Sequence, residues 1–120
     1  MAWEVEYTNE FGAWWDSLSE DEQAAVRAKV LLLREDGPAL GRPNADTLAK
    51  LSRHSNMKEL RVQHAGDPYR VLFAFDPRRV AILLLGGRKL DEKWYEDAVP
   101  RADKLYDDHL RTLRQEGTAF

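Results

Sequence analysis

The sequence predicts a single α+β domain over residues 1–120, built on a small antiparallel sheet of about four strands. Two observations predict this class. Four short segments alternate apolar with polar residues, as half-buried strands do, one near the start of the chain and three in succession in its middle. After the first of these segments, and again after the last, apolar residues recur at a helical spacing. We therefore expect an N-terminal helix hairpin on one face of the sheet and a further helix at the C-terminal end.

The first third of the chain predicts one strand and two helices. In residues 3–7, WEVEY, three apolar residues alternate with two Glu, which is the period of a strand. A brief helix is expected over residues 11–18. Ser19 and Glu22 then have the Ser-x-x-Glu spacing of a capping box, which begins a second helix that the Gly-Pro pair at 37–38 ends. We expect these helices to pack on the sheet as an antiparallel hairpin.

The rest of the chain predicts a surface connection, three strands and a helix. Residues 38–56 are rich in Pro, Gly, Asn and Ser, and could form at most a helical turn, over residues 45–51. Strands joined by turns are expected to form a meander over residues 57–63, 68–75 and 79–85. A Gly-Gly pair at 86–87 ends the last strand. A helical spacing follows from Leu90, with Pro100 at a break in the helix or at its start.

Composition and charge exclude several classes of protein. The chain has no Cys, which excludes disulfides and thiolate metal sites, and no apolar run approaches the ~20 residues of a membrane span. Its start has no signal-peptide pattern, so we expect a cytoplasmic protein without membrane contact. The net charge of −3 argues against a general nucleic-acid binder. The cations are nevertheless concentrated, because residues 37–93 hold 11 Lys and Arg against 6 Asp and Glu, whereas residues 1–36 hold 3 against 9.

Several of the central cations lie in the predicted strands. Arg61 and Arg70 alternate with the large apolar residues of their strands, so we expect both to project from the open, helix-free face of the sheet. Lys58, near a strand end, is expected to reach the rim of that face. Arg88 and Lys89 are expected to converge on it from the end of the last strand. Cations that converge with few carboxylates nearby suggest an anionic ligand.

The nearby carboxylate, Glu59, leaves two interpretations open. In the first, Glu59 forms an exposed cross-strand ion network with Arg61 and Arg70, which contributes little stability. In the second, the cations bind a phosphate of RNA, and the adjacent 2′-hydroxyl attacks that phosphate. Glu59 or a lysine would then act as the base and Lys89 or another cation as the acid, with no metal ion or cofactor required.

The second interpretation defines a set of site residues. The predicted catalytic residues are Lys58, Glu59, Arg61, Arg70 and Lys89. Three further cations are predicted to bind RNA, namely Arg53, Arg88 and Lys93. The histidines have no metal-ligand spacing, so no metal site is predicted. We interpret the Trp14–Trp15 pair as packing between helix and sheet rather than as a platform for base stacking.

Three runs in the middle of the chain carry a resemblance to a known family. They are ELR at 59–61, YRVLFAF at 69–75 and AILLLGGRK at 81–89, preceded by the two N-terminal helices. In this order and spacing they resemble the RelE/ParE toxin superfamily, especially its HigB-like, phage-derived branch, over nearly the whole chain. The resemblance implies a RelE-like fold and a bacterial type II toxin that enters the ribosomal A site and cuts mRNA. It also implies a cognate antitoxin, expected to be a small HigA-like helix-turn-helix repressor.

Carried over residue by residue, the resemblance assigns mRNA cleavage to Arg61 of the Leu-Arg pair, Arg70 of the Tyr-Arg pair and Lys89 after the last strand. Two other functions stay open. One is a ParE-like, non-enzymatic inhibitor of DNA gyrase, and the other is a degenerate toxin that serves only as the binding partner of its antitoxin. Trp94 and Tyr95 are interpreted either as docking points for the antitoxin or as core residues.

Overall fold

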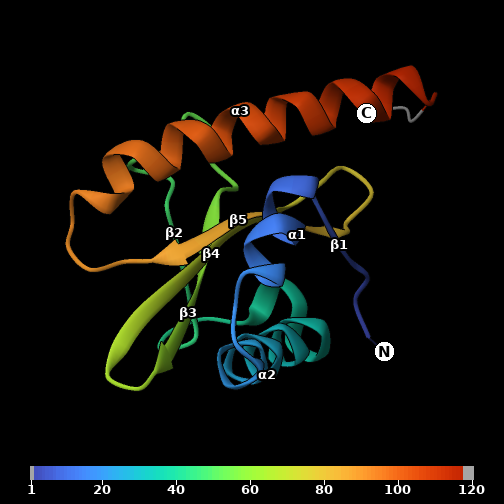
Figure 1. Ribbon diagram of the computed structural model, residues 1–120. Helices are drawn as coiled ribbons and strands as arrows, with labels where there is room; N and C mark the ends of the chain where they lie inside the picture. The colour runs from blue at the N-terminus through green and yellow to red at the C-terminus, as the bar shows by residue number, and fades with distance from the viewer. Residues whose placement is uncertain (1, 118–120) are drawn as a thin grey trace.

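A computed structural model describes residues 2–117, which form an α+β fold (Figure 1). The helices are α1 (Asn9–Asp16), α2 (Glu20–Asp36) and α3 (Trp94–Gln115), with a 3₁₀ turn, η1, over Gly37–Ala39. The strands are β1 (Val5–Tyr7), β2 (Ala45–Thr47), β3 (Lys58–His64), β4 (Asp67–Phe75) and β5 (Ala81–Arg88). The predicted fold class is confirmed. Within residues 2–117, no helix combines the length and the apolar character that crossing a bilayer requires.

Local signals set the ends of the first two helices. The Thr8 hydroxyl accepts a hydrogen bond from the Phe11 N–H at 3.0 Å and begins α1. Ser19 and Glu22 form the predicted capping box, in which each side chain accepts a hydrogen bond from the backbone N–H of the other, at 3.1 and 2.9 Å. Gly37 follows the last residue of α2, as predicted. These helix ends are therefore determined by residues close to them in the sequence.

The sheet has five strands in the order β1-β5-β4-β3-β2. β3, β4 and β5 form the predicted antiparallel meander, whereas β1 pairs with β5 in parallel, so the sheet is mixed. The sheet is therefore mixed rather than antiparallel as predicted, and it has one strand more than the predicted number of about four. The additional strand, β2, pairs with β3 where at most a helical turn was expected. Pairing prevails there because it satisfies the backbone groups along the edge of β3 and buries Ala45.

Helices cover both faces of the sheet, and Figure 1 shows α3 on one side with α1 and α2 on the other. The helix hairpin packs on the row that includes Leu60 and Phe73. α3 packs on the opposite row, which includes Leu72, Ala74 and Leu84. The prediction that this second face is free of helices is therefore wrong for much of the sheet. The reason is that its apolar residues also need to be removed from water.

β5 continues through Gly86 and Gly87, although the pair was predicted to end the strand. A Cβ atom at Gly86 would lie 2.3 Å from the ring of Trp14, and one at Gly87 would lie 2.9 Å from the ring of Trp94. The two glycines therefore let an aromatic ring pack directly on the strand backbone from each face. The Trp14–Trp15 pair packs between helix and sheet, as predicted.

Pro100 lies inside α3 rather than at its start or at a break. Ala98, Val99 and Ala102 on both sides of Pro100 are buried against the sheet. This burial stabilises the helix through a residue that cannot donate a backbone hydrogen bond. As a result α3 runs without interruption from the end of the sheet that carries the central cations.

Candidate functional site

Arg61 on β3 and Arg70 on β4 are direct partners across the two strands. Two guanidinium groups in this relation would repel each other. Glu59 separates them, because its Oε2 lies 3.2 Å from Arg61 Nη2 and its Oε1 lies 3.2 Å from Arg70 Nε. The prediction that both arginines project from the same face is confirmed. The ion network with Glu59 that the sequence left open is also present, but it is buried rather than exposed.

The burial of this network differs from residue to residue. The side chain of Glu59 is 3% exposed, that of Arg70 is 12% exposed and that of Arg61 is 32% exposed. Burial of a carboxylate at the depth of Glu59 is costly unless charged or hydrogen-bonding partners compensate it, and Glu59 has both. Arg61 is the arginine that solvent, or a ligand, reaches first.

The first turn of α3 closes one side of the network through Tyr95. Its hydroxyl donates a hydrogen bond to Glu59 Oε1 at 2.5 Å and accepts one from Arg70 Nε at 3.3 Å. Burial, together with the hydrogen bond to Glu59, raises the pKa of Tyr95 to about 12. The Tyr95 hydroxyl therefore keeps its proton at neutral pH and holds the carboxylate in place.

Lys89 joins the same cluster from the residue after β5. Its Nζ lies 5.6 Å from the centre of the Tyr95 ring and 2.7 Å from Glu92 Oε1. The hydrogen bond from Lys89 lowers the pKa of Glu92. The Glu92 side chain is 81% exposed, so the pair is weak and a stronger anion can replace it. The structure thus brings Glu59, Arg61, Arg70 and Lys89 together.

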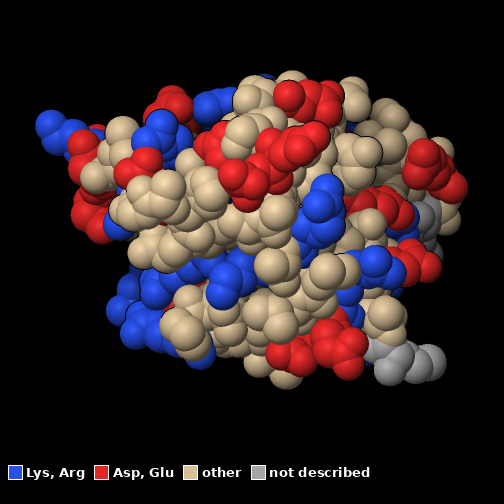
Figure 2. Space-filling model, turned by 60° about the horizontal axis from the view of Figure 1, so that its bottom comes forward, with Lys and Arg blue, Asp and Glu red and all other residues tan. Residues whose placement is uncertain are grey.

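A pocket of about 440 Å³ opens beside the two arginines and is termed the cationic pocket. It is lined by Lys29, Pro43, Asn44, Arg61, Gln63 and Arg70. None of these lining residues is acidic. Figure 2 shows a face of the molecule on which Lys and Arg side chains gather in a band, with Asp and Glu mainly along its margins. The pocket lining thus carries three cations, of which Arg61 also pairs with Asp46, at 3.3 Å.

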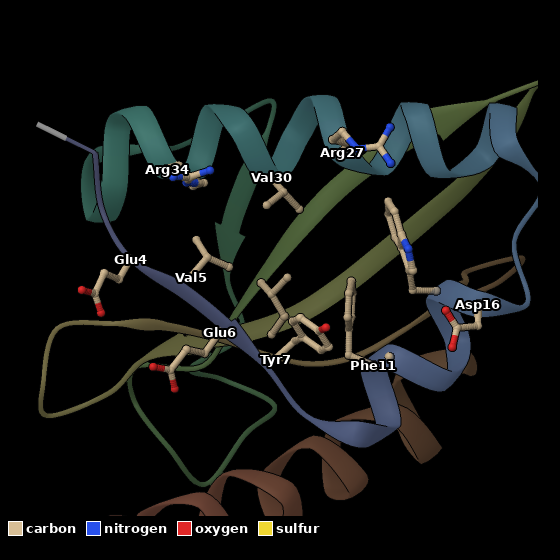
Figure 3. Close-up of a pocket in the computed structure, with 12 residues that line it drawn as sticks. Glu4, Val5, Glu6, Tyr7, Phe11, Asp16, Arg27, Val30 and Arg34 are labelled. Carbon is tan, nitrogen blue, oxygen red and sulfur yellow. The ribbon is translucent and has the colours of Figure 1, made fainter.

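A larger groove of about 690 Å³ lies at the β1 edge of the sheet, between β1, α1 and α2, and is termed the β1 groove. Figure 3 shows Val5, Phe11 and Val30 facing this space, whereas Glu4 and Glu6 turn away from it. The larger of these two hollows is thus apolar at its centre and lies at the edge of the sheet opposite β2.

Comparison with known proteins identifies the family. The family model of the phage-derived Gp49-like proteins (DUF891) matches residues 13–107. The chain belongs to this family. The Gp49-like chain is also 44% identical over 101 residues to toxin HigB2 and 46% identical over 99 residues to toxin HigB3, both of Mycobacterium tuberculosis. These alignments cover 82% and 81% of the chain.

The chain spans about half the length of HigB2, at 50%, and 84% of HigB3. The Gp49-like chain also superposes on a chain of the archaeal RelE–RelB complex from Pyrococcus horikoshii OT3, with a TM-score of 0.54. That likeness covers 75% of this chain and 98% of the other at 16% identity, so it concerns the fold alone. The HigB-like branch and the RelE-like fold that the sequence resemblance implied are both confirmed.

Lys58, the remaining predicted catalytic residue, lies on the other face of the sheet. It shares the strand alternation of Leu60, and its Nζ donates a hydrogen bond to the Pro38 carbonyl at 3.3 Å. The expectation that Lys58 reaches the rim of the arginine face is therefore wrong. The reason is that η1 offers an acceptor on the helix-hairpin side, where the alternation already points the side chain.

The cations predicted only to bind RNA are spread over the surface of the Gp49-like chain. Arg88 points to the helix-hairpin face, where it pairs with Asp67. Arg53 pairs with Asp107 of α3. Lys93 is exposed at the N-cap of α3. The expectation that Arg88 converges with the arginine face is wrong, and the RNA-binding roles of all these cations stay predictions.

Two members of the arrangement, Lys29 and Tyr95, were not among the predicted site residues. Lys29 lies off the apolar stripe of α2, and nothing in that helix indicates that Asn44 will lie beside it. The role of Tyr95 could have been predicted, because a tyrosine at the start of the helix that follows the basic segment offers a hydroxyl for a hydrogen bond near the cations. It was interpreted only as an apolar contact, which overlooked its hydrogen-bonding group.

Two of the three histidines fasten α3 to the rest of the fold rather than contribute to this site. His54 Nε2 lies 2.7 Å from Asp107 Oδ1, and His109 Nε2 lies 2.8 Å from Asp76 Oδ2. These contacts fasten α3 to the loop before β3 and to the turn between β4 and β5. In the part of the chain from residue 2 to residue 117, no three His, Asp or Glu side chains are arranged to hold a metal ion.

Proposed function

We propose that this Gp49-like protein is the toxin of a type II toxin–antitoxin system and that it cleaves mRNA on the ribosome. The observation that carries the proposal is the convergence of Arg61 and Arg70 on the buried carboxylate of Glu59, with Lys89 against the ring of Tyr95, next to a pocket whose lining has no acidic residue. The relatives at 44% and 46% identity are named toxins, which supports the toxin assignment. The positive face supports a nucleic acid as the target.

In the proposed reaction the 2′-oxygen of one nucleotide attacks the adjacent phosphorus. A bond forms between the phosphorus and this oxygen, the bond to the 5′-oxygen breaks, and the products carry a 2′,3′-cyclic phosphate and a 5′-hydroxyl. Negative charge grows on the non-bridging oxygens during the attack, and guanidinium groups bind such oxygens through paired N–H donors. The phosphate meets Arg61 first and is then held by both Arg61 and Arg70.

The protons move through Glu59 and Lys89. An incoming phosphate competes with Glu59 for the guanidinium N–H groups of Arg61 and Arg70, which frees carboxylate oxygens to take the proton of the 2′-hydroxyl. The ammonium of Lys89 gives a proton to the leaving 5′-oxygen. Tyr95 stays protonated and keeps its hydrogen bond to Glu59, so it positions the base. This route uses no metal ion or cofactor.

The proposal includes a protein partner and a cellular location. The RelE chain of similar fold was solved together with RelB, which supports an antitoxin partner for this chain. The sequence resemblance favours a HigA-like helix-turn-helix antitoxin. Because the ribosome is the proposed place of cleavage, the cytoplasm is the proposed location.

Expression of the protein in a bacterium without its antitoxin tests the function. We expect growth arrest, together with new mRNA 5′ ends inside translated regions when these ends are mapped by primer extension. A matched message without a start codon should stay intact, because ribosomes do not translate it. Intact messages with altered plasmid supercoiling would instead indicate a ParE-like gyrase inhibitor. Neither effect, together with a stable complex with the antitoxin, would indicate a degenerate toxin.

A further inference from the structure

Lys29 reaches the cationic pocket from α2, and the cleavage chemistry above does not use it. Its Nζ donates a hydrogen bond to Asn44 Oδ1 at 2.6 Å. Among residues 2–117, Lys29 forms no salt bridge with a carboxylate. An ammonium group whose fixed partner is a neutral amide is oriented while its charge stays available to an anion.

Asn44 is itself held in place beside Arg61. Its backbone N–H donates to the Gly41 carbonyl at 3.0 Å, and its own carbonyl accepts from the Arg61 N–H at 2.8 Å. The contact between Lys29 and Asn44 is therefore tied to the backbone of β3. Arg61 contacts Glu59 and also lines the cationic pocket together with Lys29, so it connects the proposed cleavage residues to this second cation.

The remaining lining of the cationic pocket offers hydrogen bonds rather than charge. Asn44 and Gln63 both carry a carboxamide, which presents an N–H donor and a carbonyl acceptor side by side. Such pairs match the edge of a base that is not engaged in a duplex. The volume of about 440 Å³ lies within the range of small-ligand sites, roughly 300–1,000 Å³. It suits one nucleotide and is too small for a double helix.

We propose that the cationic pocket binds one unpaired nucleotide next to the scissile phosphate. Lys29 contacts the phosphate of that nucleotide, and the carboxamides of Asn44 and Gln63 face its base. This inference rests on the proposed function, since it extends the same face by one nucleotide. It makes the protein selective for single-stranded RNA, a property that phosphate contacts from Arg61 and Arg70 alone would not give.

The test measures binding separately from cleavage. A fluorescein-labelled, single-stranded 2′-O-methyl RNA oligonucleotide is titrated with full-length protein, and anisotropy is recorded at several salt concentrations. Its blocked 2′-oxygens cannot attack, so only binding is measured. For Lys29→Ala we expect affinity to fall about fivefold and the slope of log affinity against log salt to flatten by about 0.7, the value for one phosphate contact on a single strand.

Two further variants control this measurement. Lys29→Arg keeps the charge and should retain most of the affinity. Lys104→Ala removes a lysine from α3 that is 76% exposed and lies outside both hollows, and it should bind like the unaltered protein. Circular dichroism verifies that each variant is folded. A duplex of the same sequence should show no difference between the unaltered protein and Lys29→Ala.

The outcomes separate this inference from the proposed function. Lys29→Ala should raise KM for RNA cleavage and leave kcat unchanged, because its contact is equally strong before and during the reaction. Affinity and salt slope unchanged in Lys29→Ala would overturn the inference, even in a protein that cleaves RNA. Binding that depends on Lys29, in a protein that never cleaves RNA, would support the nucleotide site and reject the nuclease.

Discussion

The cationic pocket and the β1 groove lie toward opposite edges of one sheet and differ in size and in chemistry. The β1 groove is larger, at about 690 Å³ against about 440 Å³. Its lining mixes acidic, basic and aromatic residues, and Arg27 within it lies 5.3 Å from the centre of the Trp15 ring. The cationic pocket joins Lys29, Arg61 and Arg70 without an acidic residue. All charged residues that line the smaller hollow are therefore cations, which suits the proposed RNA phosphate, whereas the lining of the larger hollow is mixed.

The difference in lining follows from which helices pack on each edge of the sheet. At the β1 edge, α1 and α2 bring apolar side chains such as Phe11 and Val30 toward the sheet, so the centre of the β1 groove is apolar and its charged residues lie around that centre. Toward the β2 edge, α3 covers the sheet only as far as Trp94 and Tyr95, and beyond that point Arg61, whose side chain is 32% exposed, lines the cationic pocket. Volume alone would favour the β1 groove over the proposed site, because volume does not record charge.

The largest effect that we expect from this contrast is loss of cleavage in Arg70→Ala. The variant removes the deeper of the two guanidinium groups that are proposed to hold the transition-state phosphate, and cleavage should fall about a hundredfold or more. The matched control is Arg34→Ala, which removes an exposed arginine from the β1 groove and should leave the rate unchanged. The measurement is the rate of mRNA cleavage on purified ribosomes.

Equal losses in Arg70→Ala and Arg34→Ala would contradict the contrast between the two hollows. Such a result would mean that overall positive charge, rather than the cationic pocket, decides activity. Circular dichroism of both variants distinguishes this outcome from a failure to fold.

Strand alternation predicted the central part of the site. It placed Arg61 and Arg70 on one face, away from Leu60, and the structure has them as direct partners. This works because a strand has a period of two and the apolar row decides which face is buried. The same rule placed Lys58 with Leu60, and the error came from expecting a long side chain to turn back around the strand end. A capping box predicted the start of α2 equally well, because both of its residues are local.

Contacts between distant segments could not be predicted in this way. The pairs Lys29–Asn44 and Tyr95–Glu59 join segments that are distant in the sequence, and the pattern of one segment does not indicate that the other will lie beside it. The packing of α3 on the second face could not be predicted for the same reason. It requires the apolar side of this helix to meet an apolar row on strands that are distant in the sequence. The sequence therefore predicted the strand-borne half of the site, whereas loops and helix ends supply the other half.

A second, intermediate effect concerns Tyr95 and its dependence on pH. Because the pKa of Tyr95 is raised from its ordinary value of 10.0 to about 12, the folded protein holds this proton more tightly than the unfolded chain does. The stabilisation is fully present below pH ~10 and is lost as pH rises from ~10 through ~12. We expect Tm to fall across this window, and to fall less steeply in Tyr95→Phe. Cleavage by Tyr95→Phe at neutral pH should decrease about tenfold, because Glu59 loses a positioning hydrogen bond.

Tyr7→Phe provides the control for this experiment from the β1 groove. Its side chain is 65% exposed, and the variant should follow the unaltered protein in both Tm and cleavage. If Tm falls equally steeply with and without the Tyr95 hydroxyl, then deprotonation of this hydroxyl is not what destabilises the protein at alkaline pH. Thermal denaturation at several pH values between 9 and 12 provides the comparison.

The smallest expected effect is that of Lys58→Ala, and it sets the boundary of the site. Lys58 and Lys89 are both partly buried, but Lys58 bonds to Pro38 on the helix-hairpin face, whereas Lys89 lies against Tyr95. Lys58→Ala should change cleavage by less than about twofold. Lys89→Ala should lower cleavage at least about tenfold, because it removes the proposed proton donor. Comparable losses in the two variants, measured on the same ribosome-bound mRNA, would mean that RNA also contacts the helix-hairpin face, and the site would then extend around the edge of the sheet.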